Sequence, residues 1–319
     1  MKNSFEVSII IVSLNAEHYI ENAIRSVMLQ FLNKDLFEII IVDGGSEDRT
    51  IELSKLILEK AEINYQIIFN EKKILASGWN IGIMASKGNY IIRIDAHSEL
   101  EQNYINTGIQ KINQNSILAG VGGVINTNSK TYIGKRMAVV LSSKIAVGSS
   151  LFRIGVKKDT FTDTAVYAVY KKQVFKKIGY FDEALIRNQD LDFHKRLNKS
   201  GYLLMTSPSM KAKYFNRGSV MKFIKQAFYN GYWVLYSKGY YPRHLAPFVF
   251  TSLMIIFILL NKDIFLIFMS IYFFTVFVAF LKFKILNSIF ETLLTFILHV
   301  SYGVGSINGL INRFFNFKL

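Results

Sequence analysis

The last 75 residues of the chain are strongly apolar, and this tail constrains the fold more than any other feature of the sequence. Residues 245–260 form a run of 16 residues without a charge, and residues 264–281 form a second uncharged run of 18. A helix that crosses a membrane needs about 20 consecutive apolar residues. The two runs therefore predict a hairpin of membrane helices, interrupted by the short polar segment 261–263.

A third apolar run, residues 285–310, is longer but contains Glu291, His299 and three glycines. It predicts a third helix that either crosses the membrane or lies in its interface. The alternative for the whole tail is a buried helical domain of a soluble protein, but such helices usually carry a polar face. Lys282 and Lys284 follow the second run and predict that this end of the hairpin faces the cytoplasm.

The charge of the chain is unevenly distributed. The sequence holds 38 Lys and Arg against 23 Asp and Glu, and the first 244 residues carry +12 of the formal +15. A basic surface attracts nucleic acid, anionic lipid or phosphorylated ligands. Because the tail indicates a membrane, membrane lipid is the expected partner and nucleic acid is not. The absence of cysteine excludes a disulfide scaffold, a cysteine-ligated metal and a thiol nucleophile.

The apolar run near the N-terminus, residues 7–14, follows Glu6 and has no small-residue cleavage site, so it predicts a strand instead of a signal peptide. The apolar tail and the lack of a signal peptide predict two parts: a cytoplasmic domain, residues 1–240, and a C-terminal membrane region of two or three helices, residues 241–319. The expected location is the inner membrane of the cell, with the first domain in the cytoplasm.

Strands and helices alternate along the first hundred residues. The patterns predict four strands, at 7–12, 38–42, 65–69 and 90–94, and three helices, at 17–30, 51–60 and 76–86. This alternation is typical of an α/β fold with a parallel sheet and helices on both faces. Ligands of such sheets bind at the carboxyl ends of the strands. The residues that follow each strand are therefore the first candidates for a site.

Polar side chains follow three of the four predicted strands: Ser13, Asn15, Glu17, Asp43, Asp95 and His97. Asp43 can accept hydrogen bonds from a base or a ribose, or it can be a turn residue before two glycines. In an extended segment, Asp95 and His97 would lie on one face and could hold a divalent cation that bridges phosphates. The imidazole favours Mn²⁺ over Mg²⁺. In the alternative reading, Asp95 caps the next segment and His97 is a surface residue.

These motifs resemble those of family 2 glycosyltransferases with the GT-A fold, a Rossmann-like, mostly parallel sheet. The segments SLNAE, VDGGSEDRT and NIGIMASKGNYIIRIDAH occur in the family's order, and the match to the succinoglycan-type ExoA subgroup extends over essentially the whole chain. The resemblance implies a UDP-sugar donor, with Asp43 at the uracil ring and a cation, Mn²⁺ before Mg²⁺, at Asp95 and His97. The implied nucleotide-sugar contacts are Ser13, Asn15, Glu17, Asp43, Asn80 and Asp95.

The resemblance also implies a catalytic base. After the turn Gly179-Tyr180-Phe181-Asp182-Glu183, the family has an acidic pair, and here Asp190 takes the position of the base. Gln189 replaces the usual Glu, which removes one negative charge beside that base. Acids in this segment also suit the first turn of a helix, and the two readings are compatible.

A basic and aromatic segment, residues 211–238, precedes the membrane hairpin and suits a membrane interface. Gln226 and Trp233 resemble part of the acceptor helix of processive relatives, but their spacing differs and the arginine is absent, so processive synthesis is not expected. The candidate acceptor contacts are Asp192, Arg217, Gln226 and Trp233. The alternative for this basic segment is a solvated face against anionic lipid.

Together, the residues and the resemblance predict an inverting transfer of a hexose from a UDP-sugar to a polyprenyl-diphosphate-linked saccharide, in the assembly of exopolysaccharide or another cell-surface glycan. Two alternatives stay open. The first is transfer of a hexose to polyprenyl phosphate. The second is an inactive, membrane-tethered subunit that binds nucleotide sugars. Gln189 and His97 keep this alternative open, because both depart from the family's usual residues.

Overall fold

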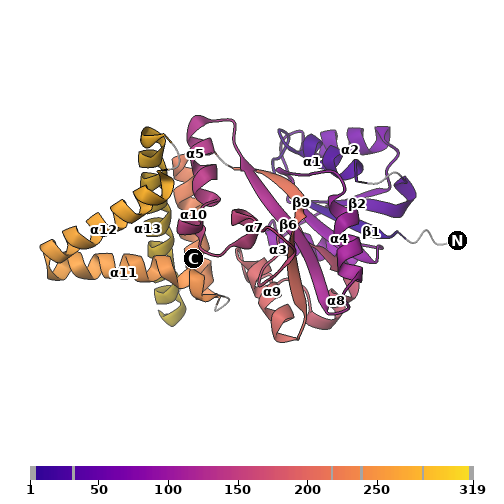
Figure 1. Ribbon diagram of the computed structural model, residues 1–319. Coiled ribbons are helices and arrows are strands. Elements are labelled where there is room, and N and C mark those ends of the chain that lie inside the picture. The colour runs from indigo at the N-terminus through magenta and orange to yellow at the C-terminus, as the bar shows by residue number, and fades with distance from the viewer. Residues whose placement is uncertain (1–4, 31–32, 217, 238–239, 282–283, 316–319) are drawn as a thin grey trace. The chain divides into compact units, whose positions relative to one another are not determined.

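The computed structural model describes residues 5–30, 33–216, 218–237, 240–281 and 284–315 (Figure 1). The chain forms two compact units, and each is built from two segments. Unit 1 contains residues 1–126 and 155–215, and unit 2 contains residues 127–154 and 216–319. The domain boundary expected at residue 240 stays a prediction.

Unit 1 is built on a mixed sheet with the strand order β3-β2-β1-β4-β8-β6-β9-β5, and β7 pairs with β9. The first four strands are parallel, as the sequence predicts: β1 (Val7–Ser13), β2 (Phe37–Asp43), β3 (Tyr65–Phe69) and β4 (Tyr90–Asp95). The register places Ser13 opposite Asp43 and Val12 opposite Asp95. The carboxyl ends of β2 and β4 therefore flank the end of β1.

The central strands are apolar on both faces because helices cover both. Ile9, Ile10 and Ile11 of β1 are all fully buried, although alternate residues point to opposite faces. The helix α3 (Leu75–Ala85) packs on β1 and β2. Its Gly82 lies so close to Ile10 that an added Cβ would be 2.5 Å from the Ile10 side chain. The remaining helices of the first half are α1 (Ile20–Met28) and α2 (Thr50–Lys60), which pack on each other.

The second half of the sheet adds antiparallel strands. They are β5 (Ser98–Leu100), β6 (Leu118–Asn128), β7 (Thr160–Thr162), β8 (Val169–Lys171) and β9 (Leu203–Phe215). The helices between them are α4 (Tyr104–Asn113), α8 (Lys172–Ile178) and α9 (Gln189–Lys199). The expected parallel order thus holds for the first four strands, and antiparallel strands, among them the long β6 and β9, extend the sheet beyond β4.

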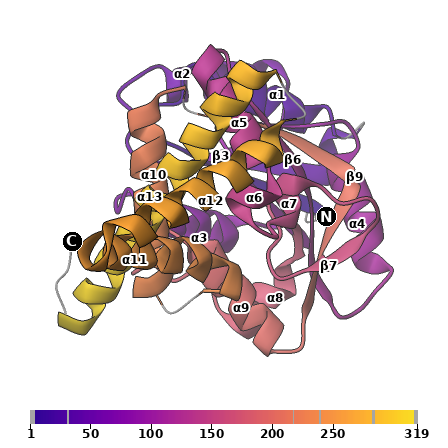
Figure 2. The same ribbon diagram turned by 60° about the vertical axis from the view of Figure 1, so that its left-hand side comes forward.

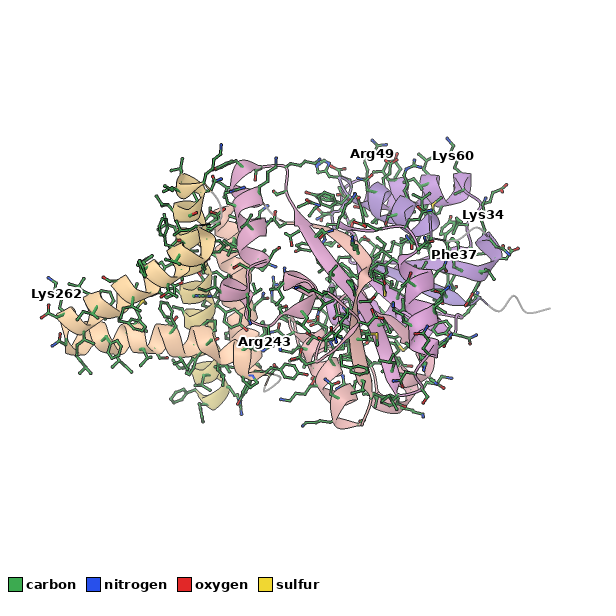
Figure 3. The ribbon with its side chains drawn as sticks, in the orientation of Figure 1. Lys34, Phe37, Arg49, Lys60, Arg243 and Lys262 are labelled. Atoms are coloured by element: carbon green, nitrogen blue, oxygen red, sulfur yellow. The ribbon has the colours of Figure 1, made fainter. Side chains whose placement is uncertain are left out.

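Unit 2 is helical. It contains α5 (Tyr132–Leu141), α6 (Lys144–Val147), α7 (Leu151–Ile154), α10 (Val220–Tyr236), the short 3₁₀ turn η2 (Pro242–His244), α11 (Leu245–Leu260), α12 (Lys262–Phe280) and α13 (Ile285–Phe315). The helices α11 and α12 run side by side in two views (Figure 1; Figure 2). Lys262 lies at the turn between them, and Arg243 lies at the other end of α11 (Figure 3).

Three helical segments of unit 2 are long and apolar enough to cross a membrane: Pro242–Leu260, Lys262–Phe280 and Ile285–Phe315. The hairpin predicted from the two uncharged runs is thus formed by α11 and α12. Asn261 begins α12 by accepting hydrogen bonds from the N–H groups of Asp263 (2.8 Å) and Ile264 (3.0 Å). The third apolar run forms one continuous helix, α13, which also packs on α10 and α5.

Glycines set the spacing between α10 and α13. A Cβ added at Gly305 would lie 2.0 Å from the carbonyl oxygen of Phe228, and one added at Gly309 would lie 2.2 Å from that of Tyr232. On α10, a Cβ at Gly231 would lie 2.0 Å from the carbonyl oxygen of Tyr302. Small residues four apart let helix backbones approach closely. The two helices are therefore held at a distance that only glycine permits at these positions.

Candidate active site

Asp43 ends β2 and is buried, with 4% of its surface exposed. Its Oδ1 atom accepts hydrogen bonds from the hydroxyls of Ser13 (2.9 Å) and Ser46 (2.6 Å). Its Oδ2 atom accepts from the backbone N–H groups of Gly45 (2.9 Å) and Ser46 (2.7 Å). Gly45 has a φ of +87°, which residues with a Cβ rarely adopt. The carboxylate therefore shapes the loop after β2, and its contact with a uracil ring stays a prediction.

The loop after β1 interlocks with the loop after β2. The N–H of Asn15 donates to the Ser46 hydroxyl (2.8 Å), and the Asn15 side chain accepts from the N–H of Glu47 (2.9 Å). The N–H of Glu17 donates to Asp48 (3.0 Å), and its carboxylate accepts from the N–H of Arg49 (3.2 Å). Four predicted donor contacts, Ser13, Asn15, Glu17 and Asp43, thus belong to one hydrogen-bonded pair of loops. The helix α1 begins at Ile20, later than the expected Glu17, because residues 13–17 form this loop.

Asp95 is the last residue of β4 and is partly buried. Its Oδ2 atom accepts a hydrogen bond from the Tyr167 hydroxyl (3.1 Å), which also lies 2.5 Å from the Ser98 hydroxyl. Burial, followed by the nearby charge of Asp95, raises the pKa of Tyr167 well above its usual value. Tyr167 has a φ of +44°, a strained conformation for an aromatic residue. The structure thus keeps a neutral hydroxyl against the Asp95 carboxylate.

The extended conformation expected from Asp95 to His97 is wrong. The strand ends at Asp95, and Ala96 and His97 form a turn into β5. The alternation of side chains along a strand therefore does not put Asp95 and His97 on the same face. The His97 ring packs edge-on against Tyr214, with ring centres 5.0 Å apart. The backbone turns here because β5 pairs antiparallel with β9.

The donor set at this turn suits a cation that is shared with a substrate. Among the residues that the structure describes, no group of three or more His, Cys, Asp or Glu side chains could hold a metal ion. Asp95 and His97 offer one carboxylate and one imidazole. Mg²⁺ and similar cations at phosphate-transfer sites commonly take one or two protein ligands and complete their shell with phosphate oxygens and water. The two residues therefore fit such a cation only together with a diphosphate.

Asp190 lies in the first turn of α9, and its side chain is 47% exposed. Its Oδ2 atom is 3.8 Å from a terminal nitrogen of Arg93, whose side chain is only 8% exposed. The Arg93 guanidinium lies over the ring of Trp79, 3.6 Å from its centre, and 4.9 Å from the ring centre of Phe181. Cation–π contacts of this kind fix a guanidinium in place. Because Arg93 is two residues before Asp95 on β4, the same strand supports both candidate acids.

Four buried polar atoms of Trp79, Arg93 and the helix α9 have no hydrogen-bond partner within the described part of the chain. They are Trp79 Nε1, Arg93 Nε, Gln189 Oε1 and His194 Nδ1. Gln189 is 3% exposed, so the residue that replaces the family's Glu lies inside the protein beside the predicted base. A Glu at this position would place a second negative charge near Arg93. With Gln189, the Arg93 charge faces the Asp190 carboxylate without that competitor.

Asn80 and Asp192 have structural partners. The Asn80 amide donates to the Phe181 carbonyl (2.9 Å) and to Glu183 (2.9 Å), and it accepts from the Phe181 N–H (3.0 Å). Asp192 accepts from Arg196 Nε (2.9 Å), and Arg196 also donates to the Tyr180 carbonyl (2.7 Å). Both residues thus hold the turn before α9, while the proposed contacts of Asn80 with the donor and of Asp192 with the acceptor stay predictions.

The other candidate acceptor residues belong to unit 2. Gln226 is partly buried on α10. Trp233, on the same helix, is 9% exposed and packs edge-on against Tyr232 and Tyr236. Arg217 lies outside the described residues. The contacts of Trp233 are those of a core residue, and the acceptor roles of Gln226, Trp233 and Arg217 stay predictions.

Comparison with known proteins identifies the family. The family described as Glycosyl transferase family 2 matches residues 8–179, which is more than half of the chain. The chain belongs to glycosyl transferase family 2. This family 2 glycosyltransferase is 32% identical over 98% of its length to the dolichyl N-acetyl-alpha-D-glucosaminyl phosphate 3-beta-D-2,3-diacetamido-2,3-dideoxy-beta-D-glucuronosyltransferase of Methanococcus voltae, and the match covers 99% of that protein.

Two further comparisons bear on the subgroup and the fold of this family 2 glycosyltransferase. The succinoglycan biosynthesis protein ExoA of Rhizobium meliloti is 26% identical over 75% of the chain, and 71% of that protein is covered, which confirms the resemblance to the ExoA group. The structure of the mannosyltransferase PcManGT from Pyrobaculum calidifontis, in complex with GDP-Man and Mn²⁺, matches 98% of this chain and 88% of its own, with a TM-score of 0.65 at 15% identity. The GT-A fold is confirmed.

Three residues of this site were not predicted: Arg93, Trp79 and Tyr167. Arg93 leaves a visible signal, because it is a basic residue in the otherwise apolar strand YIIRID and shares a face with Asp95. Trp79 and Tyr167 leave none. Trp79 is one of several apolar residues on α3, which packs on β1 and β2, and Tyr167 approaches from a segment beside β8, in the antiparallel half of the sheet.

His194 gives the fold a dependence on pH. It is 1% exposed and its Nε2 atom lies 2.6 Å from the Tyr170 hydroxyl. Burial lowers the pKa of His194 to about 4 from 6.5, so the unfolded chain takes up a proton in this range while the folded protein does not. Burial of neutral His194 therefore costs no stability above pH 6.5. As the pH falls from 6.5 to about 4, the free energy of unfolding decreases by about 3 kcal/mol in total.

We expect the melting temperature of the wild type to fall more between pH 7 and pH 5 than that of His194→Gln, which keeps a hydrogen-bond acceptor without the titration. The difference should be about 4 °C, measured by thermal unfolding in detergent. His18→Gln is the matched control, because the His18 side chain is 81% exposed. Equal pH dependence of the wild type and His194→Gln would contradict the prediction.

Proposed function

We propose that this chain is an inverting glycosyltransferase that moves a hexose from a UDP-sugar to a saccharide carried by a polyprenyl diphosphate, on the cytoplasmic side of the inner membrane. The observation that carries the proposal is the placement of Asp43 and Asp95 at the ends of the two strands that flank β1. In open α/β sheets this edge is where ligands bind. Asp43 suits the base of the donor, and Asp95 suits its diphosphate.

The acceptor side of the proposal rests on the three apolar helices and on the relatives. The Methanococcus voltae protein acts, by its name, on a dolichyl-linked N-acetylglucosaminyl phosphate, and the match spans both chains almost completely. The ExoA relative acts, by its name, in succinoglycan biosynthesis. A lipid-linked saccharide in a cell-surface glycan pathway is the acceptor that suits both. Because the first of these acceptors has a single phosphate, transfer to a monophosphate-linked acceptor is the second candidate.

In the proposed reaction, the acceptor hydroxyl loses its proton to a carboxylate oxygen of Asp190 as its oxygen bonds to the anomeric carbon. The bond from that carbon to the β-phosphate oxygen breaks on the opposite side, and UDP leaves with the bonding electrons. The configuration at the anomeric carbon therefore inverts, and no enzyme nucleophile is required. Arg93, whose guanidinium contacts the rings of Trp79 and Phe181, lies 3.8 Å from Asp190 and orients its carboxylate.

A divalent cation, Mn²⁺ before Mg²⁺, is part of the proposal. Asp95 and His97 would hold it, and when bound it would offset the negative charge that develops on the departing diphosphate. The Tyr167 hydroxyl then orients the Asp95 carboxylate by its hydrogen bond of 3.1 Å. The PcManGT structure, which contains Mn²⁺ together with GDP-Man, supports a cation of this kind.

The test is the release of UDP from a panel of UDP-sugars by the full chain in detergent, with Mn²⁺ or with EDTA. We expect slow release from one donor, abolished by EDTA and lowered about 100-fold in Asp95→Ala. Asp35→Ala, an exposed acid away from the loops, is the control and should behave as wild type. If no donor reacts, calorimetry decides: UDP binding that requires Mn²⁺ and Asp95 supports the proposal, and no UDP binding overturns it.

A further inference from the structure

A polar pocket of about 460 Å³ lies within unit 2, and no step of the proposed reaction uses it. Its lining includes Asn128, Ser129, Lys135, Arg136, Ser142 and Phe280. Most of these residues belong to α5 or to the segments that flank it, and Phe280 is the last residue of α12. The volume is within the range of sites for small molecules. The pocket therefore joins hydroxyls, an amide and two cations with one aromatic side chain.

The arginine of this pocket has an unused donor. Arg136 Nη1 donates to Glu291 Oε1 at 2.9 Å, and Glu291 of α13 is fully buried. The Nε atom of Arg136 is also buried, and it has no hydrogen-bond partner among the residues that the structure describes. A buried charged N–H without a partner is costly. The Arg136 side chain as a whole is 18% exposed, and the part of it that lines the pocket can meet an anion there.

The charge of the pocket is positive on balance. Glu291 neutralises Arg136 from outside the pocket lining, and Lys135, which is exposed, adds a second cation. Ser129 and Ser142 add hydroxyl groups that can donate to phosphate oxygens. Arginine, lysine and hydroxyl side chains that line one pocket are the groups that bind phosphate in proteins.

The pocket lies at one end of the apolar helices. The helix α12 has 19 residues, about 28 Å of helix, and the pocket includes its final residue, Phe280. The start of α13 lies beside this end, because the Ser288 hydroxyl donates to the Phe280 carbonyl at 2.7 Å. Tyr132 of α5 donates to Asn287 at 2.9 Å. If α12 crosses the membrane, the pocket is at the level of lipid phosphates.

We propose that this pocket binds the phosphate groups of the prenyl carrier that holds the acceptor saccharide. The inference rests on the proposed function, which supplies a lipid-linked acceptor, and it assigns residues to the phosphate of that lipid. The exposed part of the Arg136 guanidinium, Lys135 and Ser142 donate to the phosphate oxygens. The pocket lies at the end of α12, so the isoprene chain would extend along the apolar surface of that helix, where Ile271, Phe274 and Val278 are exposed.

Binding of farnesyl diphosphate to the full chain in detergent tests the proposal, with pyrophosphate and farnesol as comparison ligands in calorimetry. We expect farnesyl diphosphate to bind at least about tenfold more tightly than either, and Lys135→Ala and Ser142→Ala each to weaken it about tenfold. Lys60→Ala, which removes one exposed charge from α2, should leave the affinity unchanged.

Three results would overturn the proposal. They are no binding of farnesyl diphosphate by the wild type, equal affinity in Lys135→Ala, and pyrophosphate binding as tight as that of farnesyl diphosphate. The last result would assign the pocket to free phosphate instead of a lipid.

Arg136→Ala is not a suitable variant, because it would leave Glu291 buried without a partner and destabilise unit 2. The double variant Arg136→Gln with Glu291→Gln removes both charges and keeps an amide pair, and it should lose at least tenfold in affinity for farnesyl diphosphate. Its unchanged affinity would contradict the role of Arg136. Mn²⁺-dependent UDP binding, measured on the same samples, reports on the proposed function separately, so failure of either proposal is seen without the other.

Discussion

Asp190→Asn should lower the rate of sugar transfer by about 10²–10⁴-fold, because the amide cannot take the proton of the acceptor hydroxyl. Donor binding should stay within a factor of about two, since the loops after β1 and β2 are held by their own hydrogen bonds and do not involve Asp190. The measurement is kcat with the lipid-linked acceptor, together with the dissociation constant of UDP for both proteins.

Asp182→Asn is the matched control for this variant. Asp182 is an exposed acid whose Oδ1 atom accepts from the N–H of Ala184 at 2.9 Å, and asparagine can accept the same hydrogen bond. Its activity should equal that of the wild type. Transfer by Asp190→Asn at a third of the wild-type rate or more would show that another group removes the proton, and Asp192 would be the next acid to replace.

Gly305→Ala should destabilise unit 2 by about 3 kcal/mol or more, although alanine is normally the better helix former by about 1 kcal/mol. The steric contact decides whether the substitution stabilises or destabilises the protein. The new Cβ would lie 2.0 Å from the Phe228 carbonyl oxygen, and α10 would have to move away. We expect a lower melting temperature and aggregated material in size-exclusion chromatography in detergent.

Val304→Ala is the control for Gly305→Ala, because Val304 is the preceding residue of α13 and is 42% exposed. It should elute and melt as the wild type does. A normal melting temperature for Gly305→Ala would show that the spacing between α10 and α13 can increase without loss of stability. The close contacts of the glycines would then not be required for the fold.

The part of the fold that could be predicted is the part in which local pattern and topology agree. The runs VSIIIV and EIIIV are buried on both faces, and their ends place Ser13 beside Asp43 in the observed register. Parallel strands bring their carboxyl ends to one edge, so the convergence of polar residues there follows from the sequence alone. The apolar hairpin is equally local, since length and composition define it.

Long-range pairing explains what the sequence did not reveal. The turn at His97 exists because β5 pairs with β9, more than 100 residues later, and no pattern near His97 signals it. The Arg93 support of Asp190 joins residues 97 positions apart. Tyr167 reaches Asp95 from a loop beside β8, a strand of only three residues that is too short to show a period. Of the three site residues that were missed, Tyr167 depends on the antiparallel half of the sheet, whereas Arg93 and Trp79 lie on β4 and α3, in the half that the sequence predicts.

The two-segment composition of unit 2 decides how a soluble catalytic fragment can be made. Residues 127–154 fold with the C-terminal helices: Met137 and Val140 share a core with Leu294 and Leu298. A protein truncated after residue 240 would keep the apolar face of α5 but lose α13, the helix that packs on it. Exposed apolar surface of this kind leads to aggregation. A fragment that folds therefore ends at residue 215 and requires a second deletion, with residue 126 joined to residue 155 by a short linker.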